Sequence, residues 1–349
     1  MVHRMARRPG WIFIALLLAA AASVSATETV VENQPASAPV VLPSAEVVPP
    51  AETKPQDFVY VAATNSDSIG RVMTPVFVNG VGPFAFMVDT GASSSVIAPR
   101  VARRLSLVPN LSSTKLLRGI TGSEEVPTVL VDSITAGGIE LSKSSLPVVE
   151  PRVFADADGI FGADAFARGC LHVNFVHARL IILPRGCPRV DDPWETIRAR
   201  TAFGGLVVVD AHVGSTRAVG IIDTGAERSL GNPALLASLK LTQRQQKMRE
   251  RTQVYAATSQ AVFGDLVVTP KVRIGGVNMN NLQVVYGDFE VFHIWGVQDQ
   301  PAIVLGIDVL GMTDAMMIDY KRSTLSVLPH NASKYPSMRR HGIPSRLPR

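Results

Sequence analysis

Asp89-Thr90-Gly91-Ala92 occurs again as Asp223-Thr224-Gly225-Ala226, 134 positions further along the chain. Each copy follows a run of apolar residues of the kind that forms a buried β-strand. Two strands that each end in an Asp predict a site where a pair of carboxyl groups meets. A single Asp-Thr-Gly is more often an ordinary turn, because Asp and Gly are common turn residues. The sequence around the two copies therefore has to distinguish a paired-carboxyl site from two ordinary turns.

That surrounding sequence repeats in register, which is typical of a duplicated unit. A Gly precedes each Asp at the same distance, a Pro and two Leu follow at the same distances, and a Gly-Gly pair, an apolar-apolar-Gly segment and a final Leu-Pro recur further on. The matching pairs are Gly80 and Gly214, Pro99 and Pro233, Leu105 and Leu239, Leu107 and Leu241, Gly137 and Gly275, Gly162 and Gly306, and Leu183 and Leu328. The chain is therefore predicted to contain two copies of one lobe.

A hydrophobic strand ending in Asp-Thr-Gly-Ala, followed about 70 to 85 residues later by two apolar residues and a Gly, resembles the pepsin and retropepsin superfamily of aspartic peptidases. The resemblance covers about residues 70 to 329 and points to an exported two-lobe member of bacterial type. It implies an all-β, bilobal acid protease fold with an internal pseudo-two-fold repeat and a few short helices. It also implies that Asp164 and Asp308 each open a short helix after a segment that passes beneath the catalytic turn.

The resemblance implies that Asp89 and Asp223 form the catalytic dyad of an aspartic endopeptidase. Two carboxyl groups about 3 Å apart cannot both stay ionised, so the pair holds one proton. One Asp then activates a water molecule as a base while the other protonates the peptide carbonyl. No metal or organic cofactor is implied, and the expected substrate is a peptide or an unfolded protein. Which carboxyl carries the proton is a property of the pair, so the sequence does not assign it.

The neighbours of each Asp are expected to support the dyad. They are Thr90, Gly91, Ala92, Thr224, Gly225 and Ala226. By resemblance, the threonines hydrogen-bond across the lobe interface, and the glycines permit a tight turn where a Cβ would crowd the carboxylate. The alanines stand where many acid-active relatives have Ser or Thr, whose hydroxyl stabilises the ionised acid. We therefore expect a mildly acidic to neutral pH optimum.

Three further features are candidates for substrate contact. Gly119-Ile120-Thr121-Gly122 fits the tip of a flap hairpin, with a plain surface hairpin as the alternative. Tyr255, in the matching stretch of the second half, is a flap candidate or simply a packing tyrosine. Glu227 follows the second motif where retroviral enzymes carry an Asp that holds substrate backbone, and the alternative is a solvated glutamate.

The two termini differ in composition from the lobes. Basic residues precede an apolar run from Trp11 to Ala22, which predicts a signal peptide cleaved after Ala26 and a periplasmic or secreted protein, with an uncleaved inner-membrane anchor as the alternative. Membrane contact is expected only through that anchor. The predicted divisions are 1–26 signal peptide, 27–57 disordered Pro/Ala-rich linker, 58–187 N-terminal lobe, 188–200 connection, 201–330 C-terminal lobe and 331–349 basic disordered tail.

Charge argues against a nucleic-acid partner. The net charge is +5, yet residues 58–330 hold 25 Lys or Arg against 24 Asp or Glu. The excess lies in the C-terminal tail, and such basic tails are commonly solvated. The histidines and cysteines show no metal-ligand spacing.

Local signals predict a disulfide and a few short helices. Cys170 and Cys187 flank an expected hairpin that turns near residues 178 and 179, so an exported protein should join them, with buried free thiols as the alternative. Pro99 and Pro233 fit the first turn of helices. Asp192-Pro193-Trp194-Glu195 also has the pattern of a capped helix start.

Two functions remain open on the sequence. The first is the endopeptidase, for which a monomer is sufficient because both lobes lie in one chain. The second is a catalytically inactive exported peptide-binding or scaffolding protein with the same fold. The second half is also longer between its two motifs, mainly between Gly287 and Pro301, and this insert either reshapes the cleft or covers a surface.

Overall fold

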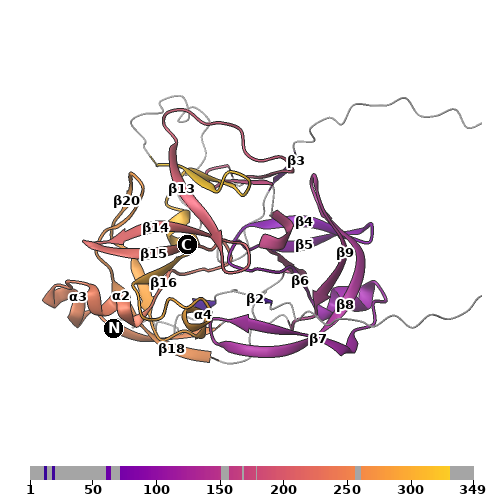
Figure 1. Cartoon of the computed structure of the whole chain (residues 1–349), viewed down its shortest axis with the longest axis horizontal. Coiled ribbons are helices and arrows are strands. Elements are labelled where there is room, and N and C mark those ends of the chain that lie inside the picture. Colours follow the sequence, from indigo (N-terminus) through magenta and orange to yellow (C-terminus); the bar gives the residue numbers. More distant parts are fainter. Residues whose placement is uncertain are drawn as a thin grey trace, which may run out of the picture.

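The computed structural model describes residues 71–150, 157–166, 169–177, 179–255 and 261–330, together with three short strands nearer the N-terminus. These residues form two β-rich lobes joined by a shared sheet (Figure 1). The predicted all-β, bilobal fold class is thus confirmed. The proposed linker and basic tail, and most of the proposed signal peptide, lie outside the described residues.

Lobe one is built on a sheet in the strand order β7-β8-β4-β5-β10-β6, with β9 paired to β8. The central strand β5 carries four buried apolar residues at its end and stops immediately before Asp89, so burial of the strand places the Asp at the centre of the molecule. The elements are β4 (Met73–Val78), β5 (Val81–Val88), β6 (Val96–Ile97), α1 (Pro99–Arg104), β7 (Asn110–Gly119), β8 (Gly122–Ala136), β9 (Ile139–Pro147), β10 (Gly159–Phe161) and the 3-10 helix η2 (Ala163–Phe166).

Lobe two repeats this arrangement. β15 stops immediately before Asp223, and it pairs in parallel with β22 just as β5 pairs with β10. The elements are β14 (Leu206–Val213), β15 (Thr216–Ile222), β16 (Leu230–Gly231), α2 (Pro233–Ser238), α3 (Gln243–Lys247), β17 (Glu250–Tyr255), β18 (Ala261–Val268), β19 (Val272–Ile274), β20 (Val277–Met279), β21 (Gln283–Tyr286), α4 (Glu290–Ile294), β22 (Ala302–Leu305) and α5 (Ile307–Leu310). The helices expected at Pro99 and Pro233 are confirmed as α1 and α2.

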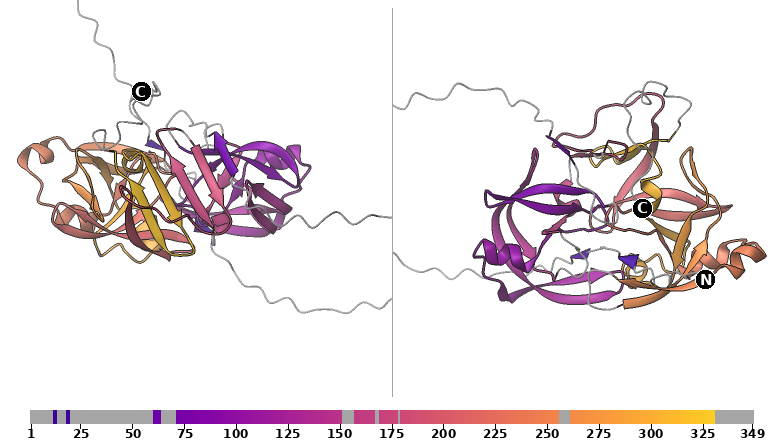
Figure 2. Two further views of the ribbon diagram at one scale, coloured as in Figure 1. Left: turned by 90° about the horizontal axis from the view of Figure 1, so that it is seen from above. Right: turned by 180° about the vertical axis from the view of Figure 1, so that it is seen from behind.

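A third sheet connects the lobes and explains why both halves end alike. The hairpin that closes each half pairs with the other, because β11 runs antiparallel to β23 from Cys170 opposite Asp319 to Asn174 opposite Ala315. Figure 2 shows this sheet lying across both lobes. Its strands are β3 (Tyr60–Ala63), β11 (Cys170–Asn174), β12 (Arg179–Leu183), β13 (Glu195–Ala202), β23 (Ala315–Asp319) and β24 (Thr324–Leu328).

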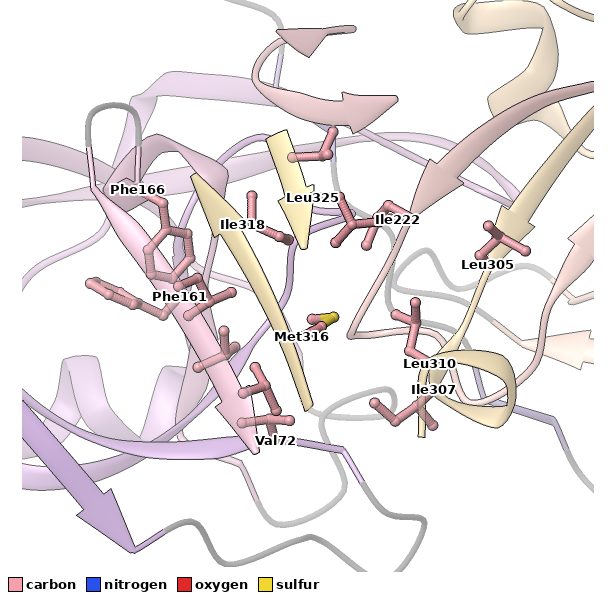
Figure 3. Packing of buried hydrophobic residues seen from close by; sticks show 14 of the residues in the cluster. Val72, Phe161, Phe166, Ile222, Leu305, Ile307, Leu310, Met316, Ile318 and Leu325 are labelled. Carbon is pink, nitrogen blue, oxygen red and sulfur yellow. The ribbon is translucent and has the colours of Figure 1, made fainter. Parts of the chain in front are cut away.

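The core runs continuously from one lobe to the other through this shared sheet. Met316 and Ile318 of β23 lie between Phe161 of lobe one and Ile222 and Leu305 of lobe two (Figure 3). These side chains are at most 1% exposed. Each fully buried side chain of this size contributes about 1.5–3 kcal/mol of transfer free energy, so the two lobes are held together mainly by apolar burial.

The connection between the lobes differs from the sequence expectation. Asp192 and Pro193 belong to a turn, and Glu195 begins β13 rather than a helix. The predicted capped helix is therefore wrong. The reason is tertiary: the first half of β13 pairs with β24 and the second half with β14, and these two sets of backbone hydrogen bonds outweigh a local helix signal.

The disulfide joins Cys170 of β11 to Cys187, as predicted. The two cysteines do not lie directly opposite each other, because the register of the hairpin places Cys170 opposite Leu183. Cys187 reaches back from beyond the end of β12, where its backbone N–H donates to Asp319 at 3.0 Å. The crosslink therefore ties the end of lobe one to the shared sheet.

Two short segments near the N-terminus also pair with the lobes. β1 (Ile12–Phe13) lies parallel to β17 of lobe two, and β2 (Leu18–Ala19) lies antiparallel to β7 of lobe one. β7 and β17 are thus sheet edges that accept an extended backbone. Both edges lie on the side of the molecule opposite the shared sheet (Figure 1).

We predict that removing the disulfide lowers stability by about 3 kcal/mol, the loss of unfolded-state constraint expected for a short crosslinked loop. The Cys170→Ala, Cys187→Ala double variant should unfold at lower denaturant concentration than the oxidised parent, measured by tryptophan fluorescence. An unchanged midpoint would show that the crosslink adds no net stability.

Candidate active site

The two aspartates of the repeated motif are brought to one place at the junction of the lobes. Each lies just beyond its strand and donates its backbone N–H to the neighbouring parallel strand, Asp89 to Phe161 at 3.1 Å and Asp223 to Leu305 at 3.0 Å. Both side chains are completely buried. The strand ends thus set the backbone position of each carboxyl group.

Each carboxyl group uses only one of its oxygens to bind its own turn. Oδ1 of Asp89 accepts the N–H groups of Gly91 and Ala92 at 2.8 and 2.9 Å, and the matching bonds in lobe two are 2.9 and 3.0 Å. The Oδ2 atoms receive no donor from other groups of the described residues. The carboxyl groups are close enough to hydrogen-bond to each other, which requires a proton on one of them.

The glycine of the second motif is required for steric reasons. A Cβ added to Gly225 would lie 2.2 Å from Oδ2 of Asp89, the carboxyl group of the other lobe. Any larger residue at this position would therefore push the two aspartates apart.

Burial raises the pKa of both aspartates. For Asp89 the main cause is loss of solvent, followed by the charge of Asp223, and its pKa lies well above the ordinary value. Burial also raises the pKa of Asp223, to about 7, against the opposing effects of its N–H donors and of the Arg71 charge. The pair therefore keeps a proton at a pH where ordinary carboxyl groups have lost theirs.

Reciprocal hydrogen bonds between the two threonines hold the lobes in register. The backbone N–H of each threonine donates to the hydroxyl of the other at 3.1 Å. The Thr90 hydroxyl donates in turn to the carbonyl of Ile222 at 2.9 Å, and the Thr224 hydroxyl to that of Val88 at 2.7 Å. All four bonds cross the interface and are buried, so they fix the spacing of the aspartates that follow Val88 and Ile222.

A second ring of polar contacts supports each motif from below, and it uses two serines that we did not single out in the sequence. In lobe two, Ser229 donates its N–H and hydroxyl to Asp308, and the same hydroxyl accepts the N–H of Gly306 at 3.0 Å. Ser95 makes the equivalent bonds to Asp164 in lobe one. Both serines lie six positions after their Asp, so the repeat register could have revealed them.

Asp164 and Asp308 lie in η2 and α5, the short helices expected at these positions. The glycine before each helix passes directly under the Asp-Thr-Gly turn. A Cβ on Gly162 would lie 2.7 Å from the backbone of Ser94, and one on Gly306 would lie 2.8 Å from the carbonyl of Ala226. The apolar-apolar-Gly motif is thus a requirement of close backbone contact.

Arg71 is a third residue that the sequence did not indicate. It precedes β4, its side chain is completely buried, and its positive charge lowers the pKa of Asp223 in the opposite lobe. Asp89 has no such cation among the causes of its shift. The environment of the two carboxyl groups is therefore unequal, although their motifs are the same.

The remaining candidates are placed as follows. Gly119 and Gly122 pair with each other at the end of the β7–β8 hairpin, with Ile120 and Thr121 at its turn. The hairpin extends from lobe one toward lobe two (Figure 1). Tyr255 ends β17, and the rest of its expected flap lies outside the described residues. Glu227 is partly buried directly after the second motif.

Within the described ranges, no group of three His, Cys, Asp or Glu side chains is arranged to hold a metal ion. No helix in the same part of the chain is long and apolar enough to cross a membrane.

Two β-lobes that each supply one Asp to a buried pair define a bilobal, pepsin-like aspartic peptidase fold. A sequence model of the aspartyl protease family matches residues 74–165 and 209–309, which make up more than half of the chain. The chain therefore belongs to the aspartyl protease family. Each matched segment contains one Asp-Thr-Gly motif together with its supporting apolar-apolar-Gly motif. No curated protein matched this sequence.

We predict that Asp223→Asn stabilises the protein at high pH. A raised pKa in the folded state means that stability is lost as pH rises from the ordinary value of 3.8 through about 7. The melting temperature of the variant at pH 8 should therefore exceed that of the parent by about 2–4 °C or more. This corresponds to a gain of about 1 kcal/mol in the free energy of unfolding. The gain should shrink toward pH 4.

The matched control is Asp132→Asn, at an exposed position of β8. It removes the same charge without relieving a buried one, so its effect should be small at both pH values. Equal melting temperatures for Asp223→Asn and the parent at pH 8 would contradict a folded-state pKa raised by burial.

Proposed function

We propose that this protein is an aspartic endopeptidase that hydrolyses peptide bonds with a water molecule activated by Asp89 and Asp223. The observation that carries the proposal is the pair of Oδ2 atoms, which are buried at one point and receive no donor from other described residues. A structural carboxylate in that position would be expected to have its lone pairs satisfied. These two oxygens remain available to a water molecule and a substrate carbonyl.

The mechanism follows from the shared proton. In the singly protonated pair, the ionised carboxylate removes a proton from the water as its oxygen attacks the peptide carbonyl carbon. The protonated carboxyl gives its proton to the carbonyl oxygen, which yields a neutral tetrahedral intermediate. Transfer of a proton to the amide nitrogen then allows the C–N bond to break. The proton belongs to the pair, so either carboxyl group serves as the first base while its partner serves as the first acid.

An extended peptide suits the two sheet edges that flank the site. β7 and β17 each pair with a short extended segment of this same chain, β2 and β1. Main-chain hydrogen bonds of this kind are how an extended peptide adds to a sheet edge. We infer that a substrate binds as a strand between these edges, with the β7–β8 hairpin as the flap. Unstructured protein segments fit this mode better than folded surfaces.

Export follows as part of the same proposal. The disulfide between Cys170 and Cys187 is typical of proteins that fold outside the reducing cytosol. It supports the signal peptide that the first 26 residues predict, and thereby a periplasmic or secreted enzyme that cuts peptides or unfolded proteins.

The alternative is a catalytically inactive peptide-binding protein with the same fold. The sheet edges would serve that function equally well. The buried acidic pair argues against it, because two carboxyl groups with raised pKa values weaken folding at neutral pH and give a pure binding protein nothing in return.

We predict that the purified protein cleaves an unstructured protein such as reduced, alkylated casein, and that Asp89→Asn and Asp223→Asn each reduce the rate by at least about a thousandfold. Each substitution removes one of the two proton-transfer groups. Cleavage is measured by the appearance of new N-termini. The control Asp132→Asn should retain the parental rate, and activity that survives in either dyad variant would exclude a shared-dyad mechanism.

We also predict a pH optimum in the mildly acidic to neutral range. The pKa values of both aspartates are raised, so the pair loses its first proton, and becomes active, at a higher pH than ordinary carboxyl groups would. Ala92 and Ala226 add no hydroxyl donor that would oppose this shift. A profile of kcat/KM against pH that peaks below about pH 3 would refute the expectation.

A further inference from the structure

The segment of residues 287–301, which is longer than the connection between β9 and β10 in lobe one, contacts the tip of the flap. It contains α4 and connects β21 to β22. The backbone N–H of Glu290 donates to the carbonyl of Ile120 at 3.1 Å, and α4 lies beside the end of the β7–β8 hairpin (Figure 1). A hydrogen bond therefore joins the flap of one lobe to the insert of the other.

Apolar contact reinforces this bond. Ile120 lies at the tip of a two-residue hairpin turn, a position that is usually exposed, yet its side chain is completely buried. It belongs to an apolar cluster that is otherwise almost entirely part of lobe two, and five members of that cluster come from the insert. These are Phe289, Val291, Phe292, Trp295 and Val297. The flap tip is thus buried in the other lobe.

The insert is held in place by contacts within lobe two, whereas the flap is a β-hairpin that extends away from the rest of lobe one (Figure 1). The side chain of Asn232, itself fully buried, donates to the carbonyls of Val297 and Gln300 at 2.9 and 2.7 Å. The ring of Trp295 stacks on Phe203 with centroids 5.4 Å apart. The insert is therefore the fixed partner of the contact, and the flap is the element that must lift to admit a substrate.

We propose that residues 287–301 form the surface on which the tip of the lobe-one flap rests, here called the landing platform. Their contact with Ile120 holds the flap over the dyad and governs substrate access. The kinetic part of this inference rests on the proposed peptidase function, but the contact itself does not. The two halves differ here in length, because lobe one has 25 positions between Gly137 and Gly162 whereas lobe two has 31 between Gly275 and Gly306. The extra length of lobe two would thus serve to hold the flap of lobe one.

The position of Glu290 allows the hydrogen bond to be removed alone. Glu290 is the first residue of α4, and Phe289 before it has an extended backbone with φ −91° and ψ 134°. Proline is well accepted at the first position of a helix and after an extended residue, and it has no N–H to donate. Glu290→Pro therefore deletes the bond to Ile120 while α4 is kept. Glu290→Ala is the matched control, since it removes the carboxylate and retains the N–H.

The first experiment measures hydrogen–deuterium exchange of the flap in an Asp223→Asn background, so that its result is independent of catalysis. Peptides that cover residues 112–125 should exchange about fivefold faster in Glu290→Pro than in Glu290→Ala, as expected for loss of one net hydrogen bond. Peptides from β23 and β24 should not change. Equal flap exchange in the two variants would overturn the proposal.

The second experiment measures peptide hydrolysis in the active background. Because the flap must lift before a substrate enters, kcat/KM should rise in Glu290→Pro relative to Glu290→Ala. A fall in kcat/KM would overturn the role in access. If no variant and no parent cleaves peptide, the proposed function fails, while the exchange experiment still decides the platform. Should Glu290→Pro not fold, Ile120→Ala replaces it in the exchange experiment with the same expected outcome.

Discussion

Four buried hydrogen bonds between Thr90 and Thr224 and their surroundings are the constraint on which the rest of the molecule depends. Each threonine binds the backbone of the other lobe on the residue directly before the opposite Asp. Neither lobe can therefore form its half of the site by itself, and a shift of one lobe against the other would break several buried bonds at once. Because an unpaired buried polar group is costly, the interface behaves as a single unit.

The shared sheet supplies most of the free energy that holds the two lobes together, and the polar contacts supply little of it. Its two hairpins pair across the junction, and their inner side chains belong to a core that extends into both lobes. The threonine bonds then select the register within which that apolar contact is made. Apolar burial provides the strength of the junction, and directional hydrogen bonds provide its geometry, since the hydrophobic effect is not directional.

Duplication explains most of the site, and departures from it explain the rest. The motif, the serine and Asp beneath it, and the close-contact glycine are present in both halves. The charge of Arg71 lowers the pKa of Asp223, and the α4 segment that hydrogen-bonds to the β7–β8 hairpin lies in lobe two. One-sided features of this kind give two equivalent carboxyl groups different environments.

Much of this was predictable from the sequence, and particular residues show where prediction ended. The aspartates, the glycines and the two Pro-initiated helices follow from local pattern and repeat register, and Ser95 and Ser229 could have been found from the same register. The helix expected at Asp192 was wrong, because pairing of β13 with two neighbours is a property of strands distant in sequence. Arg71 gave no signal, since a single Arg near a strand does not reveal which charge in another lobe it will face.

The amino-acid sequence by itself determined the duplicated β-lobes and the chemical groups of the candidate site, because these depend on residue type, short-range periodicity and the sterics of glycine. Only the tertiary structure decided how the two halves meet, which oxygens of the dyad are left without a donor, and where the flap rests. Those features depend on contacts between segments more than a hundred residues apart, whose spacing is set by burial of the shared core and not by any local pattern.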